Sequence, residues 1–141
     1  LDRRMVRLAD ELKARSPRLE VLLRDARADV ELFREENVPL ETELSDLSQK
    51  YEQVMGAMTV TFDGREQTLS QMAVYQERTD RAVREAAWRG VVERRLADKA
   101  AIDAIFDQMV ERRHRLAINA GFSNFVGFSF KAKHRFDYTP A

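Results

Sequence analysis

The sequence of 141 residues contains no cysteine, which excludes a disulfide scaffold and a zinc site built on thiolates. Only three prolines and five glycines interrupt it, so long stretches are free to form helices. Neither sign of charge is in excess, because Lys plus Arg number 24 and Asp plus Glu also number 24. A neutral chain lacks the overall field that draws proteins to nucleic acid or to an anionic membrane, so we expect neither partner.

Long hydrophobic runs are also absent: no run of 18 apolar residues exists, and no signal peptide opens the chain. We therefore predict a cytoplasmic protein. The numbering starts at Leu1, inside a helical pattern without an initiator methionine. It ends at Thr139-Pro140-Ala141, where proline would suit the first turn of another helix. From these two ends we expect a piece of a larger protein.

What the sequence does contain is a helical stretch of unusual length, predicted over residues 79–120. Thr79 or Asp80 can cap its start, and Gly121 can close its end in a left-handed conformation. Because the apolar pattern skips a turn near residues 97–99, we predict a kink or break there. Apolar residues otherwise recur mostly three or four positions apart, the period of a helix with one buried face: Val83, Ala87, Trp88, Val91, Val92, Leu96, Ile102, Ile105, Phe106, Met109, Val110, Leu116 and Ala117.

Three shorter helices are predicted before it, over residues 1–15, 17–36 and 39–55. Pro17 suits the first position of the second helix. Pro39 disfavours helical geometry at Val38 and so is expected to separate the second helix from the third. Short connections imply antiparallel packing. The predicted buried faces are Leu19, Leu22, Leu23, Ala26, Val30 and Phe33 in the second helix, and Leu40, Leu44, Leu47, Tyr51 and Val54 in the third.

A β-hairpin is predicted over residues 57–69, where the apolar period changes from 3.6 to 2 around Asp63-Gly64. An isolated hairpin is barely stable in water, so its apolar face must rest on a helix. Short helices follow over residues 70–77, with Ser70 as the expected cap, and over residues 124–131, with Asn124 as the cap. The predicted fold is mainly α: antiparallel helices, one very long kinked helix and a single β-hairpin, in one helical domain spanning residues 1–141.

The two histidines are the first candidates for metal ligands. Neither His114 nor His134 belongs to an H-E-x-x-H motif, which places two imidazoles on one helical turn with a glutamate base between them. Glu111 and His114 have the Glu-x-x-His spacing of di-iron bundles, but such a site needs a second copy that this sequence lacks. A solvated helix face is the better interpretation, and no metal ligand is assigned.

The segment Phe122 to Arg135 mixes aromatic and basic residues, the composition that binds single-stranded nucleic acid. Its phenylalanines precede its charges rather than alternating with them, so we expect it to pack beneath the long helix. Gly127 stands alone and forms no phosphate-binding loop, and the pair Glu35-Glu36 has no catalytic companion. We assign no catalytic, cofactor-binding or metal-binding residue, and we expect no cofactor in this chain.

Three motifs, in order, resemble the oligoendopeptidase F-like and thimet-like zinc peptidases. They are a strand pair around an Asp-Gly turn (residues 59–69), Thr79-Asp80-Arg81-x-x-Arg84-x-x-x-Trp88, and a helix end reading Arg115-x-Ala117-x-x-Ala120-Gly121-Phe122-x-Asn124-Phe125. Residues 135–140 are also similar to the following segment in one subgroup of that family. The match covers about half of the chain, from Thr59 onward.

This resemblance implies a largely helical enzyme whose deep channel admits only short peptides. It also implies zinc held by the two histidines of H-E-x-x-H and a later glutamate, with the glutamate of the motif activating water. None of those residues is in this sequence. The chain would supply one wall of the channel and a scaffold for the catalytic helices. The group Asp80, Arg81 and Arg84 is expected to be structural, tying the helix start to its neighbours.

The first hypothesis is therefore the N-terminal, non-catalytic part of a zinc-dependent oligopeptidase that hydrolyses short peptides. Its partners would be the catalytic part of the same protein and peptide substrates of the whole enzyme. An apolar surface awaiting that part would favour self-association of the chain alone. The second hypothesis is a non-enzymatic helical scaffold or interaction module.

Overall fold

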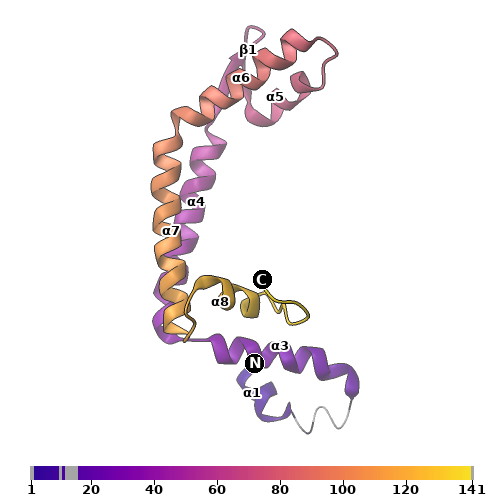
Figure 1. Ribbon diagram of the computed structural model, residues 1–141, viewed down its shortest axis with the longest axis vertical. Coiled ribbons are helices and arrows are strands. Elements are labelled where there is room, and N and C mark those ends of the chain that lie inside the picture. The colour runs from indigo at the N-terminus through magenta and orange to yellow at the C-terminus, as the bar shows by residue number, and fades with distance from the viewer. Residues whose placement is uncertain (1, 10, 12–15, 141) are drawn as a thin grey trace. The chain divides into compact units, whose positions relative to one another are not determined.

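The computed structural model describes residues 2–9, 11 and 16–140, and it is mainly α with one two-stranded antiparallel sheet, as the sequence predicts (Figure 1). The elements in order are α1 (Asp2–Arg7), η1 (Pro17–Leu19), α3 (Glu20–Leu32), η2 (Glu35–Asn37), α4 (Val38–Gly56), β1 (Thr59–Phe62), β2 (Arg65–Thr68), α5 (Leu69–Gln76), α6 (Arg81–Ala97), α7 (Lys99–Asn119) and α8 (Phe125–Ala132), where η marks a 3₁₀ turn. The predicted first helix, residues 1–15, lies partly outside the described residues, since positions 1, 10 and 12–15 are not among them.

The chain divides into two compact units. The first unit comprises residues 1–43 and 111–141, and the second comprises residues 44–110. The long helices α4 and α7 each contribute residues to both units. No helix within the described ranges has both the length and the hydrophobicity that crossing a membrane requires.

In the first unit, α3 packs against α1 on one side and against α8 on another (Figure 1). Its core is made largely of small or medium side chains, which let helices approach closely: Ala9, Leu23, Ala26, Ala28, Leu32, Leu40, Leu116, Ala117 and Ala120. A bond between the Arg112 guanidinium and the Glu43 carboxylate (2.9 Å) joins α7 to α4 in this unit.

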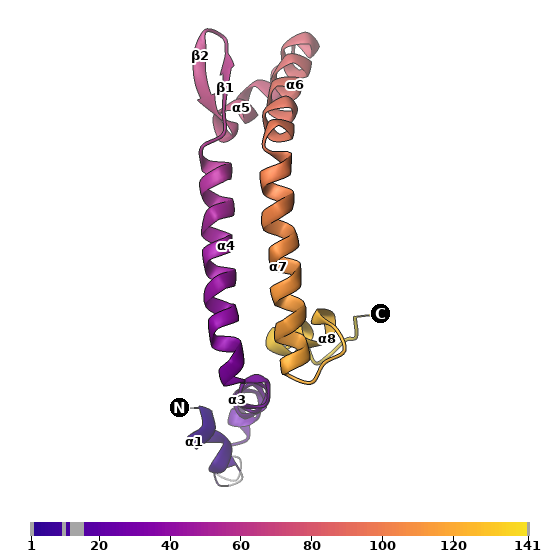
Figure 2. The same cartoon turned by 90° about the vertical axis from the view of Figure 1, so that its left-hand side faces the viewer.

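The second unit is organised around the hairpin. Asp63 and Gly64 both have positive φ, 53° and 73°, which is the type I′ turn that the Asp-Gly pair predicts. Val60 and Phe62 rest on a small core of Met72, Ala87 and Val91 from α5 and α6, and the strands lie beside α6 (Figure 2). The expectation that the apolar face of the hairpin needs a helix is confirmed.

The predicted break in the long helix falls at Asp98, between the end of α6 and the start of α7. Its carboxylate pairs with the Arg94 guanidinium at 2.8 Å, one turn earlier. At the far end of α7, Gly121 has a φ of 84°, while Phe122 N–H donates to the Ala117 carbonyl and Gly121 N–H to the Ile118 carbonyl. These two bonds form a Schellman motif, so the predicted glycine terminator is confirmed.

Three local predictions about helix ends were wrong. Val38 is helical (φ −55°, ψ −48°) although Pro39 follows it. The helix α4 therefore begins one residue before its predicted start at Pro39. Proline is tolerated there because the N–H groups of a first helical turn have no partner within the helix. The preceding helix ends at Leu32 rather than at residue 36, because Phe33 and Arg34 are extended.

The third error concerns the cap of α5. Thr68, not Ser70, is the capping residue: its hydroxyl accepts from Gln71 N–H at 3.2 Å, and the Gln71 side chain accepts from Thr68 N–H at 2.8 Å. This reciprocal pair is a capping box, which satisfies two backbone donors where Ser70 could satisfy one.

The predicted buried face of α3 was half right. Leu23 and Ala26 are buried, but Leu22 and Phe33 are about half exposed (50% and 49%), and Ala28 and Leu32 are buried in addition. The end of the helix at Leu32 turns Phe33 out of the helical register. The other side chains of α3 that are buried depend on how the neighbouring helices α1 and α8 pack against it.

Candidate functional site

The residues that the sequence analysis weighed for metal binding do not come together. Glu111 pairs with the Arg112 guanidinium at 3.0 Å, and His114 is exposed. In the described part of the chain, no group of three His, Asp or Glu side chains is placed to hold a metal ion. The zinc that the family resemblance implies therefore does not fit the residues present, and no chemistry through a metal follows from them.

The start of α6 is held as the resemblance predicts. The Asp80 carboxylate accepts from Ala82 N–H at 2.8 Å and so caps the helix. The Arg84 guanidinium donates to the carbonyls of Arg78 (2.7 Å) and Thr79 (2.8 Å), which precede the helix. Both side chains fix the direction in which the chain enters α6, so the structural role expected for them is confirmed. Arg81 lines an open cavity of about 470 Å³ on this helix.

A buried polar contact that the sequence analysis missed joins η2 to α7. Asn37 is 2% exposed; its amide donates to the Leu116 carbonyl at 3.2 Å, and its side-chain oxygen accepts from the Asn119 amide at 2.7 Å. All of its side-chain polar atoms thus avoid the cost of unpaired burial. The partners are 79 and 82 positions away, so no local pattern in the sequence could reveal them.

The segment Phe122–Arg135 packs in a different place from the one expected. Its helix α8 lies against α3 rather than beneath the long helix (Figure 1), with a contact to α7 where the Arg113 guanidinium lies 5.8 Å from the centre of the Phe125 ring. The Phe128 ring contacts the rings of Phe122 and Phe125, with centroids 5.9 Å and 5.7 Å away. The rings are thus used in mutual packing, which does not favour a platform for stacked bases. Glu35 and Glu36 lie exposed in η2.

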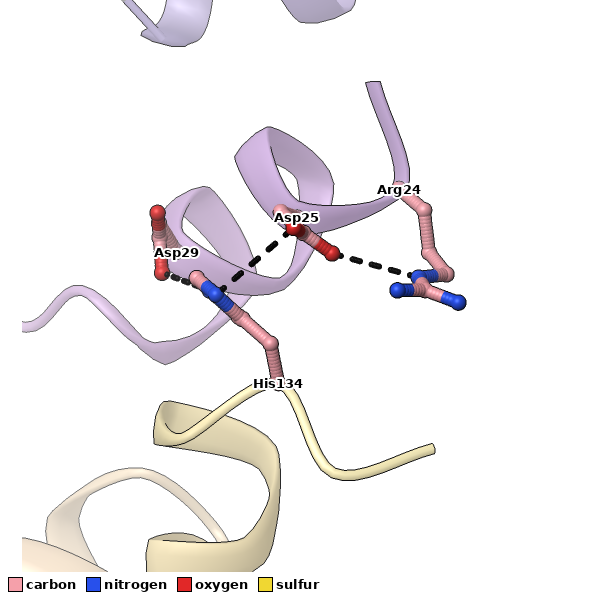
Figure 3. Close-up of polar contacts among 4 residues, drawn as sticks. All are labelled: Arg24, Asp25, Asp29 and His134. Atoms are coloured by element: carbon pink, nitrogen blue, oxygen red, sulfur yellow. Dashed lines mark hydrogen bonds and ion pairs between the residues drawn. The ribbon is translucent and has the colours of Figure 1, made fainter. Parts of the chain in front are cut away.

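His134 follows α8 and makes the cluster shown in Figure 3. Its Nε2 lies 2.8 Å from the Asp29 carboxylate and its Nδ1 lies 3.8 Å from the Asp25 carboxylate, both on α3. Asp25 also accepts from the Arg24 guanidinium at 3.2 Å. Because the two carboxylates meet different ring nitrogens, the three groups do not converge on one point, which explains why they form no metal site.

The second unit carries large apolar side chains of α6 and α7 at its surface. The first half of α7 carries five large apolar side chains within nine residues, and each is at least partly exposed: Ile102, Ile105, Phe106, Met109 and Val110. Phe106 is 58% exposed and Val110 48%. On α6, Trp88 and Leu96 are 54% and 60% exposed, with Val92 between them at the same helical spacing.

We call these side chains of α6 and α7 the apolar stripe: Trp88, Val92, Leu96, Ile102, Ile105, Phe106, Met109 and Val110. Large exposed apolar patches are rare on soluble proteins, and where they occur they usually mark a contact with another polypeptide. Its rim is charged; the Asp103 carboxylate, which accepts from Lys99, raises the pKa of Lys99.

No family model matches the sequence, and no curated protein matches it. Solved structures do. A protein assigned as oligoendopeptidase F from Bacillus anthracis str. Ames aligns with 94% of this chain at 28% identity and a TM-score of 0.86. PZ peptidase A, solved with an inhibitor, aligns with 93% at 25% identity and a TM-score of 0.86. A further structure assigned as oligoendopeptidase F aligns with 99% at 24% identity and a TM-score of 0.91, a likeness of fold.

The chain spans about a quarter of the length of these structures, between 23% and 25%. The resemblance to oligoendopeptidase F that the short motifs indicated is thus confirmed for this chain. The structural alignment also extends beyond the half of the chain that carries those motifs. In particular, the helices before the hairpin, which agreed with the family only in being helical, fall within the aligned part.

Proposed function

We propose that this chain is the N-terminal, non-catalytic helical part of a cytoplasmic zinc-dependent oligopeptidase that hydrolyses short peptides. The observation that carries the proposal is the structural match to an oligoendopeptidase F over 94% of the chain but 24% of the matched protein. A piece of this size that reproduces the fold of a peptidase segment is best explained as the same segment of a similar enzyme.

The role of the chain within that enzyme is a scaffold and a channel wall. The bonds of Asp80, Arg84 and Asn37 hold helix ends in fixed directions and perform no chemistry. The sequence contains no H-E-x-x-H motif, and hydrolysis is assigned to the segment of the enzyme that carries it. Zinc held by that segment would supply the Lewis acid that activates water.

The apolar stripe is the surface that we expect another segment of the same enzyme to cover. Burying one large aliphatic or aromatic side chain contributes about 1.5–3 kcal/mol, so covering several of these residues would stabilise the assembled enzyme strongly. In the chain alone the same surface favours self-association. A complete helical scaffold or interaction module, the alternative function, would need another partner for the same surface.

The decisive experiment combines sequence and assay. The open reading frame that encodes the chain is read past Ala141, and the chain is purified alone and together with the downstream segment. We expect an H-E-x-x-H motif downstream, no cleavage of short peptides by the chain with added zinc, and zinc-dependent cleavage by the combination. Turnover by the chain alone would contradict the assignment of catalysis, and a stop codon directly after Ala141 would favour the scaffold.

A further inference from the structure

His134 occupies a backbone position that suits glycine. It follows α8 with a φ of 52°, in the left-handed region. Arg135 N–H donates to the Phe130 carbonyl at 2.9 Å and His134 N–H donates to the Lys131 carbonyl at 3.0 Å. These bonds form a Schellman motif, the same helix end that Gly121 makes after α7, but with a residue that carries a Cβ. The left-handed conformation is unfavourable for such a residue, because its Cβ comes close to the following carbonyl oxygen.

The imidazole explains why a residue other than glycine is tolerated there. It reaches across to α3, where Asp25 and Asp29 are one helical turn apart and both face it (Figure 3). Its other neighbour is the ring of Phe136, 6.1 Å away and nearly parallel, and the Arg24 guanidinium lies 4.6 Å from the centre of that ring. The chain after α8 is therefore tied to α3 through one imidazole and one phenyl ring.

The protonation state of the imidazole determines how many hydrogen bonds it can donate to the two carboxylates of α3. A neutral imidazole has one N–H donor, and a carboxylate can only accept. When Nε2–H donates to Asp29, the lone pair of Nδ1 faces the Asp25 carboxylate 3.8 Å away, which is unfavourable. A protonated imidazole presents an N–H to each carboxylate.

The surrounding charges point the same way. Among Arg24, Asp25 and Asp29 there is one positive and two negative charges, so a protonated imidazole brings the cluster to neutrality. Lys131 on α8 pairs with Glu31 on α3, so these two charges balance each other, and the Arg135 guanidinium lies over the Phe130 ring at 5.5 Å. Lys133 and Asp137 lie on the same segment as the imidazole, carry opposite charges and are exposed.

We propose that His134 forms a pH-sensitive contact that holds the C-terminal segment, residues 135–140, against α3. When the imidazole is protonated, the segment is held on α3; when the imidazole is neutral, the segment detaches more often. Histidine is the side chain whose charge ordinarily changes between pH 5 and 8. This inference does not depend on the proposed peptidase function.

The test measures the order of the C-terminal segment in the 141-residue chain by NMR, as backbone ¹⁵N relaxation and amide exchange corrected for intrinsic rates. On lowering the pH from about 8 to about 5.5, we expect the protection of the Arg135 and Phe136 amides to rise about fivefold, the range of a half-exposed ion pair. The gain should shrink in high salt, which screens partly exposed charges.

Two variants separate the imidazole from the backbone. His134→Asn keeps a residue that tolerates the left-handed conformation but does not titrate, and Asp25→Asn with Asp29→Asn keeps the imidazole and removes its partners. Both should lose the pH response while the circular dichroism of the chain stays unchanged. The matched control is His114→Gln, which removes the exposed histidine on α7 and should keep the full response. A pH response that survives in His134→Asn, or a wild-type chain without one, would overturn the proposal.

Discussion

The helices α6 and α7 follow each other in the chain and carry similar apolar patterns, yet they end in opposite environments. α6 buries Ala87 and Val91 under the hairpin, and these side chains are 0% and 6% exposed. The first half of α7 has larger apolar residues at the same spacing, and none of residues 99–110 is buried. A helical pattern thus shows that a face needs cover, but the cover itself can lie elsewhere in the protein.

The difference has a local cause on α6. Gly90 has no Cβ, and one built there would lie 3.1 Å from the Val60 Cγ1 atom of β1. The missing side chain lets the strand approach the helix closely enough to seal the small core. α7 has no glycine in its first half and no strand packed on it among the described elements.

The largest expected effect comes from opening the covered core. Met72 is 0% exposed, so Met72→Ala should lower the free energy of unfolding by about 3 kcal/mol through lost burial and the cavity left behind. Chemical denaturation followed by circular dichroism measures it. The matched control is Phe106→Ala on the uncovered helix, which should change stability by less than about 0.5 kcal/mol in the chain alone. Equal losses would mean that Phe106 is covered after all.

A substitution at Gly90 should also test the difference between the covered helix α6 and the uncovered helix α7. Gly90→Leu introduces a good helix former, but its side chain must displace Val60, so we expect a net loss of about 1–3 kcal/mol. Gly56→Leu is the comparison, because a Cβ at Gly56 meets no atom within 4 Å. Thermal unfolding of both variants distinguishes a packing clash from a general effect of glycine replacement; a stabilised Gly90→Leu would contradict close packing of the strand.

The hairpin side of the core depends on the start of α5. Thr68→Ala removes the capping box and should cost about 1 kcal/mol. Ser70→Ala, which changes the residue favoured from the sequence, should stay within about 0.5 kcal/mol of the wild type. The same denaturation assay decides between the two residues, and a larger loss at Ser70 would reverse the assignment of the cap.

The smallest effect on stability, with the clearest effect on association, is expected on the apolar stripe. Phe106→Glu with Val110→Glu should leave the unfolding midpoint nearly unchanged, because both side chains are already exposed. If the stripe drives self-association, sedimentation velocity should show a shift toward monomer relative to the wild-type chain. Gln108→Glu is a charge control outside the stripe. A wild-type chain that stays monomeric at high concentration would argue against an open apolar contact surface.

Much of the fold follows from short-range chemistry and was predictable for that reason. The Asp63-Gly64 turn fixes the hairpin because both positions need positive φ, and Gly121 ends α7 because only glycine adopts that conformation without strain. The errors arose where two local options were close in energy. Thr68 and Ser70 can both cap, and the reciprocal bond from Gln71 decided between them.

The candidate site was less predictable than the fold. His134 meets Asp29 across 105 positions of sequence, and Asn37 meets Asn119 across 82. Neither pair has a spacing that a local rule could detect. The sequence did indicate that the metal candidates Glu111 and His114 sit among charges, but only the structure shows the Arg112 guanidinium that pairs with Glu111.

By itself the sequence determined the helical class, the turn and most of the helix ends, since these depend on dihedral preferences and backbone hydrogen bonds within a few residues. The tertiary structure decided which apolar faces are covered, where α8 lies, and which charges meet His134. Those outcomes depend on contacts between segments that lie far apart in the sequence. The apolar pattern of a single helix does not specify which other segment covers it.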